Sequence, residues 1–282
     1  MAETSEAQAG ALTAQDLANI RWAHARLEHP SLAARLSNFI GTPIEGAMGL
    51  LPAGAQLRIR RAAESAIRRA LDVALLSIGD DVSPVRGQLA HRLLATASGA
   101  VGGWFGPFAL AAELPVVTIL MLRSIAEIAR AEGEDLATLE ARLACVEVFA
   151  LGGRTHDDDA AETGYFGLRA AIALHFFGGI EAAVGQAESI PLGVGLIRGI
   201  AARFGVVVSD KAAVQLVPVI GAASGALVNF VFMKHFQDVA RGHFVLRRLE
   251  RRHGTGRVRE AYERVVAEAR AAAREFSPLE GW

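Results

Sequence analysis

The chain has 282 residues, of which 52% are hydrophobic and 21% charged, with 29 Lys and Arg against 30 Asp and Glu. A chain of this length can bury a substantial core without a structural metal or disulfides, and its balanced charge excludes a nucleic-acid binder that works by global positive charge. The single cysteine, Cys145, excludes an internal disulfide framework and fits a reducing compartment. The first ten residues have neither a basic start nor an apolar run, so we expect no cleaved secretory signal.

Helical periodicity begins early and continues through most of the chain. Residues 1–12 are small and polar and predict a disordered lead-in. From Thr13 onward the pattern predicts two short helices separated by Pro30, followed by a loop over residues 41–55. Residues 56–79 predict an amphipathic helix with a basic face. The arginines on this helix are Arg58, Arg60, Arg61, Arg68 and Arg69.

Two long apolar segments, residues 93–122 and 212–233, raise the question of a membrane span. A spanning helix needs about 20 apolar residues without a break, but Gly and Pro residues divide both segments. We therefore predict helical hairpins buried in protein, with membrane-inserted hairpins as the alternative. Small residues at i and i+4 would let these helices approach closely in either setting. The residues expected to form the hairpins are Gly99, Gly103, Trp104, Phe105, Pro107, Gly221 and Gly225.

The remaining pattern predicts further helices. One is expected to begin at Glu134 and Asp135 and to end at Gly152, and a helix from about 165 to 177 follows the polar linker. The former should bury Leu136, Leu139, Leu143, Val146 and Ala150. Asp210 is a candidate N-cap for a helix through Val217.

The C-terminal part of the chain has the clearest helical spacing. A long helix is expected over residues 226–252, and a last helix over 258–276 precedes a tail at 277–282. The buried line of the long helix should comprise Phe232, Phe236, Val239, His243 and Leu246. No regular series of strands is present in the pattern. We therefore predict an all-α, multi-helix bundle in which residues 13–276 form one domain and the two Gly-rich apolar segments pack as hairpins.

No sequence motif predicts a catalytic reaction. The nucleophile elbow, the Walker A motif and the dinucleotide fingerprint are absent from the sequence. Residues 156–159 (His-Asp-Asp-Asp) could offer metal ligands, but consecutive residues seldom converge on one ion. We therefore predict no metal, no cofactor and no catalytic residues.

Four polar residues are expected in apolar surroundings. Tyr165 and Arg169 stand at i and i+4, Asn229 interrupts an apolar run, and His243 falls on the buried line of the long helix. A buried polar group left without a partner costs about 1–3 kcal/mol, so these residues predict a hydrogen-bond network. A functional cluster in a pocket between helices is the alternative.

The order of several segments resembles the EcsC family of bacterial proteins. These segments are LPAGAQ, ALLSIGDD, the Gly-rich apolar hairpin, VFALGG, TGYFGLRAA and VPVIGAASGALVNFVFMKHFQDVARGHFVLRRLER, which span about 51–254. The resemblance carries over Tyr165, Arg169, Gly221, Gly225, Asn229, His243, Phe244, Arg247, Leu249 and Glu250. Arg247 thereby joins the candidate polar cluster.

The resemblance implies an accessory role at a membrane. The family is named for a protein encoded beside the ATPase and membrane subunits of an ABC-type exporter, and it supplies no catalytic residues. We expect a non-enzymatic protein at the cytoplasmic face of the cell membrane, with membrane lipid or an ABC-transporter subunit as its partner. Basic residues without interleaved aromatics predict no nucleic-acid binding. The alternatives are a soluble helical carrier of an apolar ligand and a hydrolase that uses the four polar residues.

Overall fold

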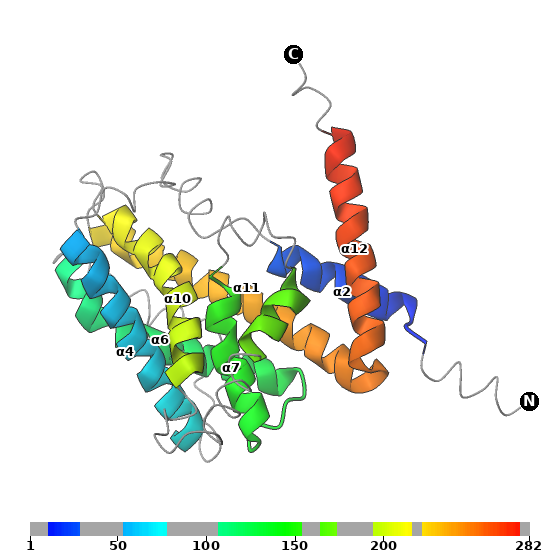
Figure 1. The fold of residues 1–282 in the computed structure, drawn as a ribbon, viewed down its shortest axis with the longest axis horizontal. Helices are drawn as coiled ribbons and strands as arrows, with labels where there is room; N and C mark the ends of the chain where they lie inside the picture. The colour runs from blue at the N-terminus through cyan, green and yellow to red at the C-terminus, as the bar shows by residue number, and fades with distance from the viewer. Residues whose placement is uncertain are drawn as a thin grey trace, which may run out of the picture.

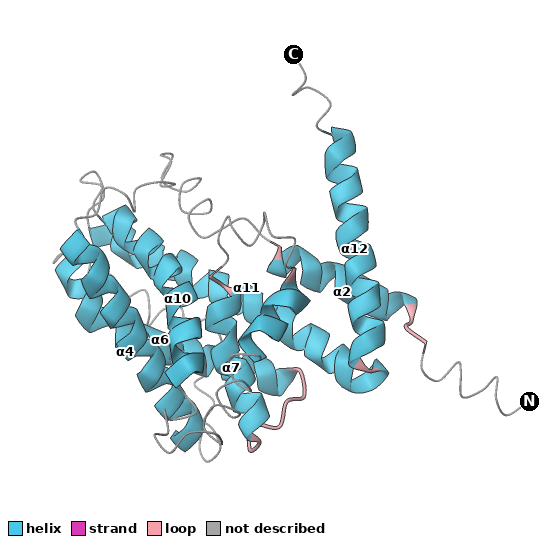
Figure 2. Cartoon of the chain, viewed as in Figure 1, coloured by secondary structure: helices cyan, strands magenta, loops and turns pink. Residues whose placement is uncertain are grey.

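The described part of the chain folds entirely into helices and loops. The computed structural model describes residues 11–28, 53–77, 107–153, 164–173, 194–215 and 222–276, and no strand occurs within these ranges (Figure 2). The helices are α2 (Ala14–Leu27), α4 (Ala53–Ser77), α6 (Pro107–Ala131), α7 (Leu139–Leu151), α10 (Val194–Gln215), α11 (Ala222–His253) and α12 (Thr255–Phe276). Residues 165–173 are also helical. The all-α prediction is confirmed.

Helix α11 is the element against which the other parts of the fold are arranged. It contacts α2 and α12 at one side of the molecule and α6, α7 and α10 at the other (Figure 1). Helix α4 packs on α6, α7 and α10. Four phenylalanine rings join α7, α10 and α11, with centroids 5.2–6.2 Å apart, and they form the aromatic centre of the core. They are Phe149, Phe204, Phe232 and Phe236.

Local sequence signals explain several helix ends. Thr13 caps α2 in a capping box with Asp16, and the hydroxyl of Thr138 accepts a hydrogen bond from the backbone N–H of Ala141 at the start of α7. Gly133 and Gly254 follow the last turns of α6 and α11 with φ of 82° and 84°, a backbone conformation that side chains with a Cβ rarely adopt. These glycines permit the sharp turns that lead into the following helices.

Several predicted boundaries were wrong. Helix α7 begins at Leu139 rather than at Glu134, because Thr138 supplies the N-cap and residues 134–138 form a turn. Leu139 is therefore 54% exposed at the first turn and does not join the buried stripe. Asp210 lies inside α10 instead of capping a helix, and α4 begins at Ala53, within the segment expected to be a loop.

The predicted hairpins fall largely outside the described residues. Gly99, Gly103, Trp104, Phe105 and Gly221 all lie there, as does the acidic linker at 156–159. Pro107 is the first residue of α6, a position where proline's missing N–H has no cost, and Gly225 lies in α11. Within the described ranges, none of the helices is both long and apolar enough to cross a bilayer.

Candidate functional site

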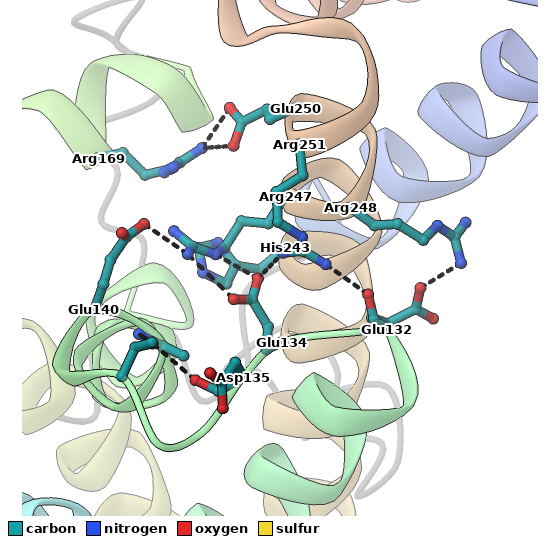
Figure 3. Close-up of polar contacts among 12 residues, drawn as sticks. Glu132, Glu134, Asp135, Glu140, Arg169, His243, Arg247, Arg248, Glu250 and Arg251 are labelled. Atoms are coloured by element: carbon teal, nitrogen blue, oxygen red, sulfur yellow. Dashed lines mark hydrogen bonds and ion pairs between the residues drawn. The ribbon is translucent and has the colours of Figure 1, made fainter.

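The C-terminal half of α11 carries a row of polar side chains that face other elements of the fold. His243, Arg247, Glu250 and Arg251 follow one another at i, i+4, i+7 and i+8, the spacing that places side chains on one face of a helix. Opposite them lie residues 165–173 and the turn that joins α6 to α7 (Figure 3). Buried apolar side chains such as Phe236 and Phe244 pack the same helix into the core.

Tyr165 and His243 form the buried centre of this network. The hydroxyl oxygen of Tyr165 lies 2.8 Å from Nδ1 of His243, and Arg169 Nη1 donates to the same oxygen at 3.2 Å. Because a guanidinium can only donate, the tyrosine oxygen accepts from Arg169, while the direction of the Tyr165–His243 bond is set by the tautomer of the imidazole.

Burial keeps both rings neutral. His243 is fully buried and Tyr165 is 5% exposed. Burial, aided by the nearby charges of Arg169 and Arg247, holds the pKa of His243 well below its ordinary value. Burial also raises the pKa of the Tyr165 hydroxyl above its usual range. The pair therefore forms an uncharged hydrogen bond within the core.

Glu250 completes the chain of contacts from the other side of Arg169. Arg169 Nη1 lies 2.8 and 3.1 Å from the two carboxylate oxygens of Glu250, and both side chains are largely buried. The side chains of Glu250, Arg169, Tyr165 and His243 are thus linked in that order, from an ion pair at one end to a neutral imidazole at the other. It ties the 165–173 helix to α11 at two points one to two turns apart.

A second group of contacts fastens the α6–α7 turn to α11. Arg247 donates through Nε to Glu134 at 2.8 Å and through Nη2 to Glu140 at 2.9 Å. Arg251 also bonds the carboxylate of Glu134, and its Nη2 donates to the backbone carbonyl of Glu132 at 2.7 Å. Arg248 pairs with the Glu132 carboxylate (Figure 3). Each of these three arginines is therefore paired with an acidic side chain of the same molecule.

The structure brings most of the predicted cluster together. Tyr165, Arg169 and His243 are in direct contact, and the charge of Arg247 acts on His243 from one turn further along α11. Asn229 is fully buried but lies fourteen residues before His243, about 21 Å along the helix axis, and so belongs to another part of the core. A hydrolase site that uses all of these residues is not assembled.

Sequence reasoning missed the acidic partners. Glu132 and Glu134 flank Gly133 in a turn, and Glu140 lies in the first turn of α7, where an acidic residue is common for local reasons. Nothing in their spacing identifies arginines more than a hundred positions away as their partners. Glu147, which lies one turn before the end of α7, also escaped notice.

Two cavities border this network. One, of about 410 Å³, lies between α7, residues 165–173, α10, α11 and the start of α12, and Glu147, Arg169 and Arg247 line it. The other, of about 530 Å³, lies between residues 164–167 and α12, and Tyr165 and Tyr262 line it. Phe166 and Arg259 contribute to both.

Other candidate groups are poorly suited to metal binding or nucleophilic chemistry. Among the described residues, no cluster of three or more His, Cys, Asp or Glu side chains could hold a metal ion. Cys145 is fully buried, and burial raises the pKa of its thiol to about 12, so the thiol stays protonated and unreactive. The network therefore has the character of a structural hydrogen-bond and ion-pair system beside two cavities.

These features define an all-α protein in which a Tyr–His–Arg–Glu network joins the central helix to the 165–173 helix. The chain belongs to the EcsC protein family: the family's sequence model matches residues 56–249, more than half of the chain. The matched span begins in α4 and ends near the C-terminus of α11, and it includes Tyr165, Arg169, His243 and Arg247. Comparison with curated proteins and with solved structures found no match.

Proposed function

We propose that this EcsC-family protein is a non-enzymatic accessory protein that associates peripherally with the cytoplasmic face of a membrane through helix α4. The observation that supports this proposal is the outer face of α4. Arg58, Arg61, Arg68 and Arg69 are all exposed there, and Leu57 beside them is 50% exposed. Basic residues next to an exposed apolar side chain are typical of helices that lie on anionic lipid.

The orientation of α4 follows from its amphipathic pattern. Its opposite face is buried against neighbouring helices through Ile59, Ala63, Ala66, Ile67 and Ala70. The arginines are thus directed away from the core. Arg68 pairs with Glu64, and the exposed Asp72 one turn further along also lowers the charge of this face, whereas Arg58, Arg61 and Arg69 make no ion pair within the described part of the chain. Each arginine near an anionic leaflet contributes roughly 1 kcal/mol.

The arginines of α11 are less suited than those of α4 to bind a membrane. Arg247, Arg248 and Arg251 are held by Glu132 and Glu134, so contact with lipid would first have to break intramolecular pairs. Arg58, Arg61 and Arg69 need no such exchange, and Arg68 makes only an exposed pair with Glu64.

The accessory role itself rests on family membership. The resemblance implies a place beside an ABC-type exporter, and attachment through α4 would hold the protein at the membrane where a transporter subunit could be contacted. Burial of Tyr165 and His243, together with the remote position of Asn229, favours this role over a hydrolase.

Vesicle flotation of the full chain tests the proposal. We expect binding to vesicles with about one-third phosphatidylglycerol but not to pure phosphatidylcholine, and we expect it to weaken as salt rises from about 0.05 to about 0.5 M. Replacing Arg58, Arg61, Arg68 and Arg69 by Gln should reduce the partition coefficient by about two orders of magnitude or more. The matched control replaces four exposed arginines of α2 and α12, namely Arg21, Arg257, Arg264 and Arg270. Equal losses in the two variants, or binding that ignores lipid charge, would contradict the proposal.

A further inference from the structure

The cavity of about 410 Å³ has apolar walls and a polar rim. Its walls include Leu143, Ala144, Ile172, Ala173 and Ile200, and Phe166 stands at its border with the neighbouring cavity. Its volume lies within the range of about 300–1,000 Å³ typical of small-molecule pockets. The cavity borders the network directly, because Arg169 and Arg247 belong to both the network and the cavity lining.

Three arginines at the rim retain unused hydrogen-bond donors. Arg169 makes its bonds through Nη1, Arg247 through Nε and Nη2, and Arg259 through Nε. The remaining guanidinium nitrogens, at least one in each residue, have no hydrogen-bond partner in the described part of the chain. Guanidinium groups present their donors in a planar fork that matches carboxylate and phosphate oxygens.

The acidic residues at the rim are compatible with an anion. Glu140 is 80% exposed, so its bond to Arg247 is a weak surface contact that a ligand can replace. Glu147 is only partly exposed, and burial raises the pKa of its carboxyl group despite the nearby charges of Arg169 and Arg247. A carboxyl group that holds its proton more readily can donate a hydrogen bond to a bound acid. An amine head would instead meet three guanidinium groups.

We propose that this cavity binds an amphipathic anion, with an apolar chain along Leu143, Ile172 and Ile200 and a carboxylate or phosphate head at Arg169, Arg247 and Arg259. Such a site is a ligand-binding function separate from attachment through α4. It does not depend on the membrane proposal, because the two surfaces share no residue.

Calorimetric titration of the full chain with single-chain amphiphiles, below their micelle concentrations, tests the head and the chain separately. We expect decanoate and decyl phosphate to bind one site, and inorganic phosphate and decyltrimethylammonium to bind at least about tenfold more weakly, since a charge-assisted hydrogen bond and the buried chain each contribute more than a factor of ten. Binding of decanoate alone or of decyl phosphate alone decides which head the site prefers and supports the proposal. Ammonium binding as tight as decanoate, inorganic phosphate binding as tight as decyl phosphate, or no binding by either anion would overturn it.

Paired variants at exposed positions locate the site without disturbing the core. Ala170→Trp should fill the cavity mouth and weaken decanoate binding by about tenfold or more, whereas Ala171→Trp, on an exposed neighbour that does not line the cavity, should leave it unchanged. Arg259→Gln should weaken binding by several-fold and Arg264→Gln should not. Equal effects within either pair would place the ligand elsewhere.

Glu147→Gln should change the affinity for decanoate in the direction opposite to Ala170→Trp and Arg259→Gln. It replaces an ionisable acid beside the bound anionic head by a neutral amide that can still donate a hydrogen bond, so decanoate should bind more tightly. Weaker binding of decanoate by this variant would contradict the proposed site. Vesicle binding through α4 should be the same in all five variants, which separates failure of the ligand site from failure of the membrane proposal.

Discussion

The hydroxyl oxygen of Tyr165 lies 2.8 Å from Nδ1 of His243, although the two residues are 78 positions apart in the chain. Both rings are buried, and their edge-to-face arrangement places the centroids 5.9 Å apart. The contact joins the 165–173 helix to the C-terminal half of α11. Since neither ring can gain or lose a proton cheaply in this position, the strength of the link depends on conditions that keep both neutral.

Tyr165→Phe removes the hydroxyl that connects His243 with Arg169. We expect the free energy of unfolding to fall by about 1–3 kcal/mol, because the buried Nδ1 of His243 loses its partner, whereas Arg169 keeps Glu250. Urea denaturation measures the change. The control is Tyr262→Phe, whose hydroxyl makes a longer contact of 3.3 Å to Glu28 and should matter less. A double-mutant cycle with His243→Phe should give a coupling of about 1 kcal/mol, and strictly additive effects would contradict a direct link.

Glu134→Gln weakens the attachment of the α6–α7 turn to α11. Glu134 is 4% exposed and pairs with Arg247, which is 12% exposed. We expect a loss of about 3 kcal/mol, the lower end for a broken buried pair, because Arg247 retains Glu140. Glu263→Gln breaks an exposed pair with Arg259 and should cost less than about 1 kcal/mol. Equal costs in urea denaturation would show that the α11 arginines act as ordinary surface charges.

The low pKa of His243 predicts a stability change in acid. In the folded protein this pKa lies well below 6.5, whereas an unfolded histidine takes up a proton near its ordinary value. The unfolded chain therefore binds more protons below about pH 6.5, so the contribution of His243 is fully present above that pH and is lost as the pH falls, by up to about 1.4 kcal/mol per unit.

The difference between wild type and His243→Gln isolates this effect. Unfolding free energies measured between about pH 5 and pH 7.5 should converge in acid, since the variant lacks the titrating group. Glu147, whose raised pKa gives a slope of the opposite sign, contributes to both proteins and cancels in the difference. Parallel pH profiles would mean that His243 does not titrate between the two states.

Gly242 and Gly199 both lie inside helices but should respond in opposite ways to alanine. A Cβ on Gly242 would lie 2.8 Å from Leu27 Cγ and 3.0 Å from the carbonyl oxygen of Ala23, where α2 crosses α11. Gly242→Ala should therefore destabilise the protein by about 1–3 kcal/mol through overpacking. A Cβ on Gly199 meets nothing within 4 Å, so Gly199→Ala should stabilise α10 by about 0.5–1 kcal/mol. The same sign for both variants in thermal unfolding would contradict the packing described for α2 and α11.

Much of the secondary structure could be predicted because helical periodicity is a local property. Phe232, Phe236, Val239, His243 and Leu246 recur at the spacing of one helix face, and all five are buried in α11. The errors at Leu139 and Asp210 concern helix ends. At Leu139 the N-cap Thr138 sets the start of α7, and at Asp210 helix α10 continues through a residue that was expected to begin a new helix. The predicted hairpins and their glycines remain predictions.

The sequence by itself determined the all-α class, the EcsC family and the polar residues that had to find partners once buried. Only the tertiary structure decided which partners they found: Tyr165 meets His243, Arg247 meets Glu134, and Asn229 lies apart. The physical reason is that a helix face depends on residues three or four positions apart, whereas an ion pair between Arg247 and Glu134 spans 113 positions and depends on how three helices pack. The same packing creates the cavity that Arg169, Arg247 and Arg259 border, which no local spacing in the chain predicts.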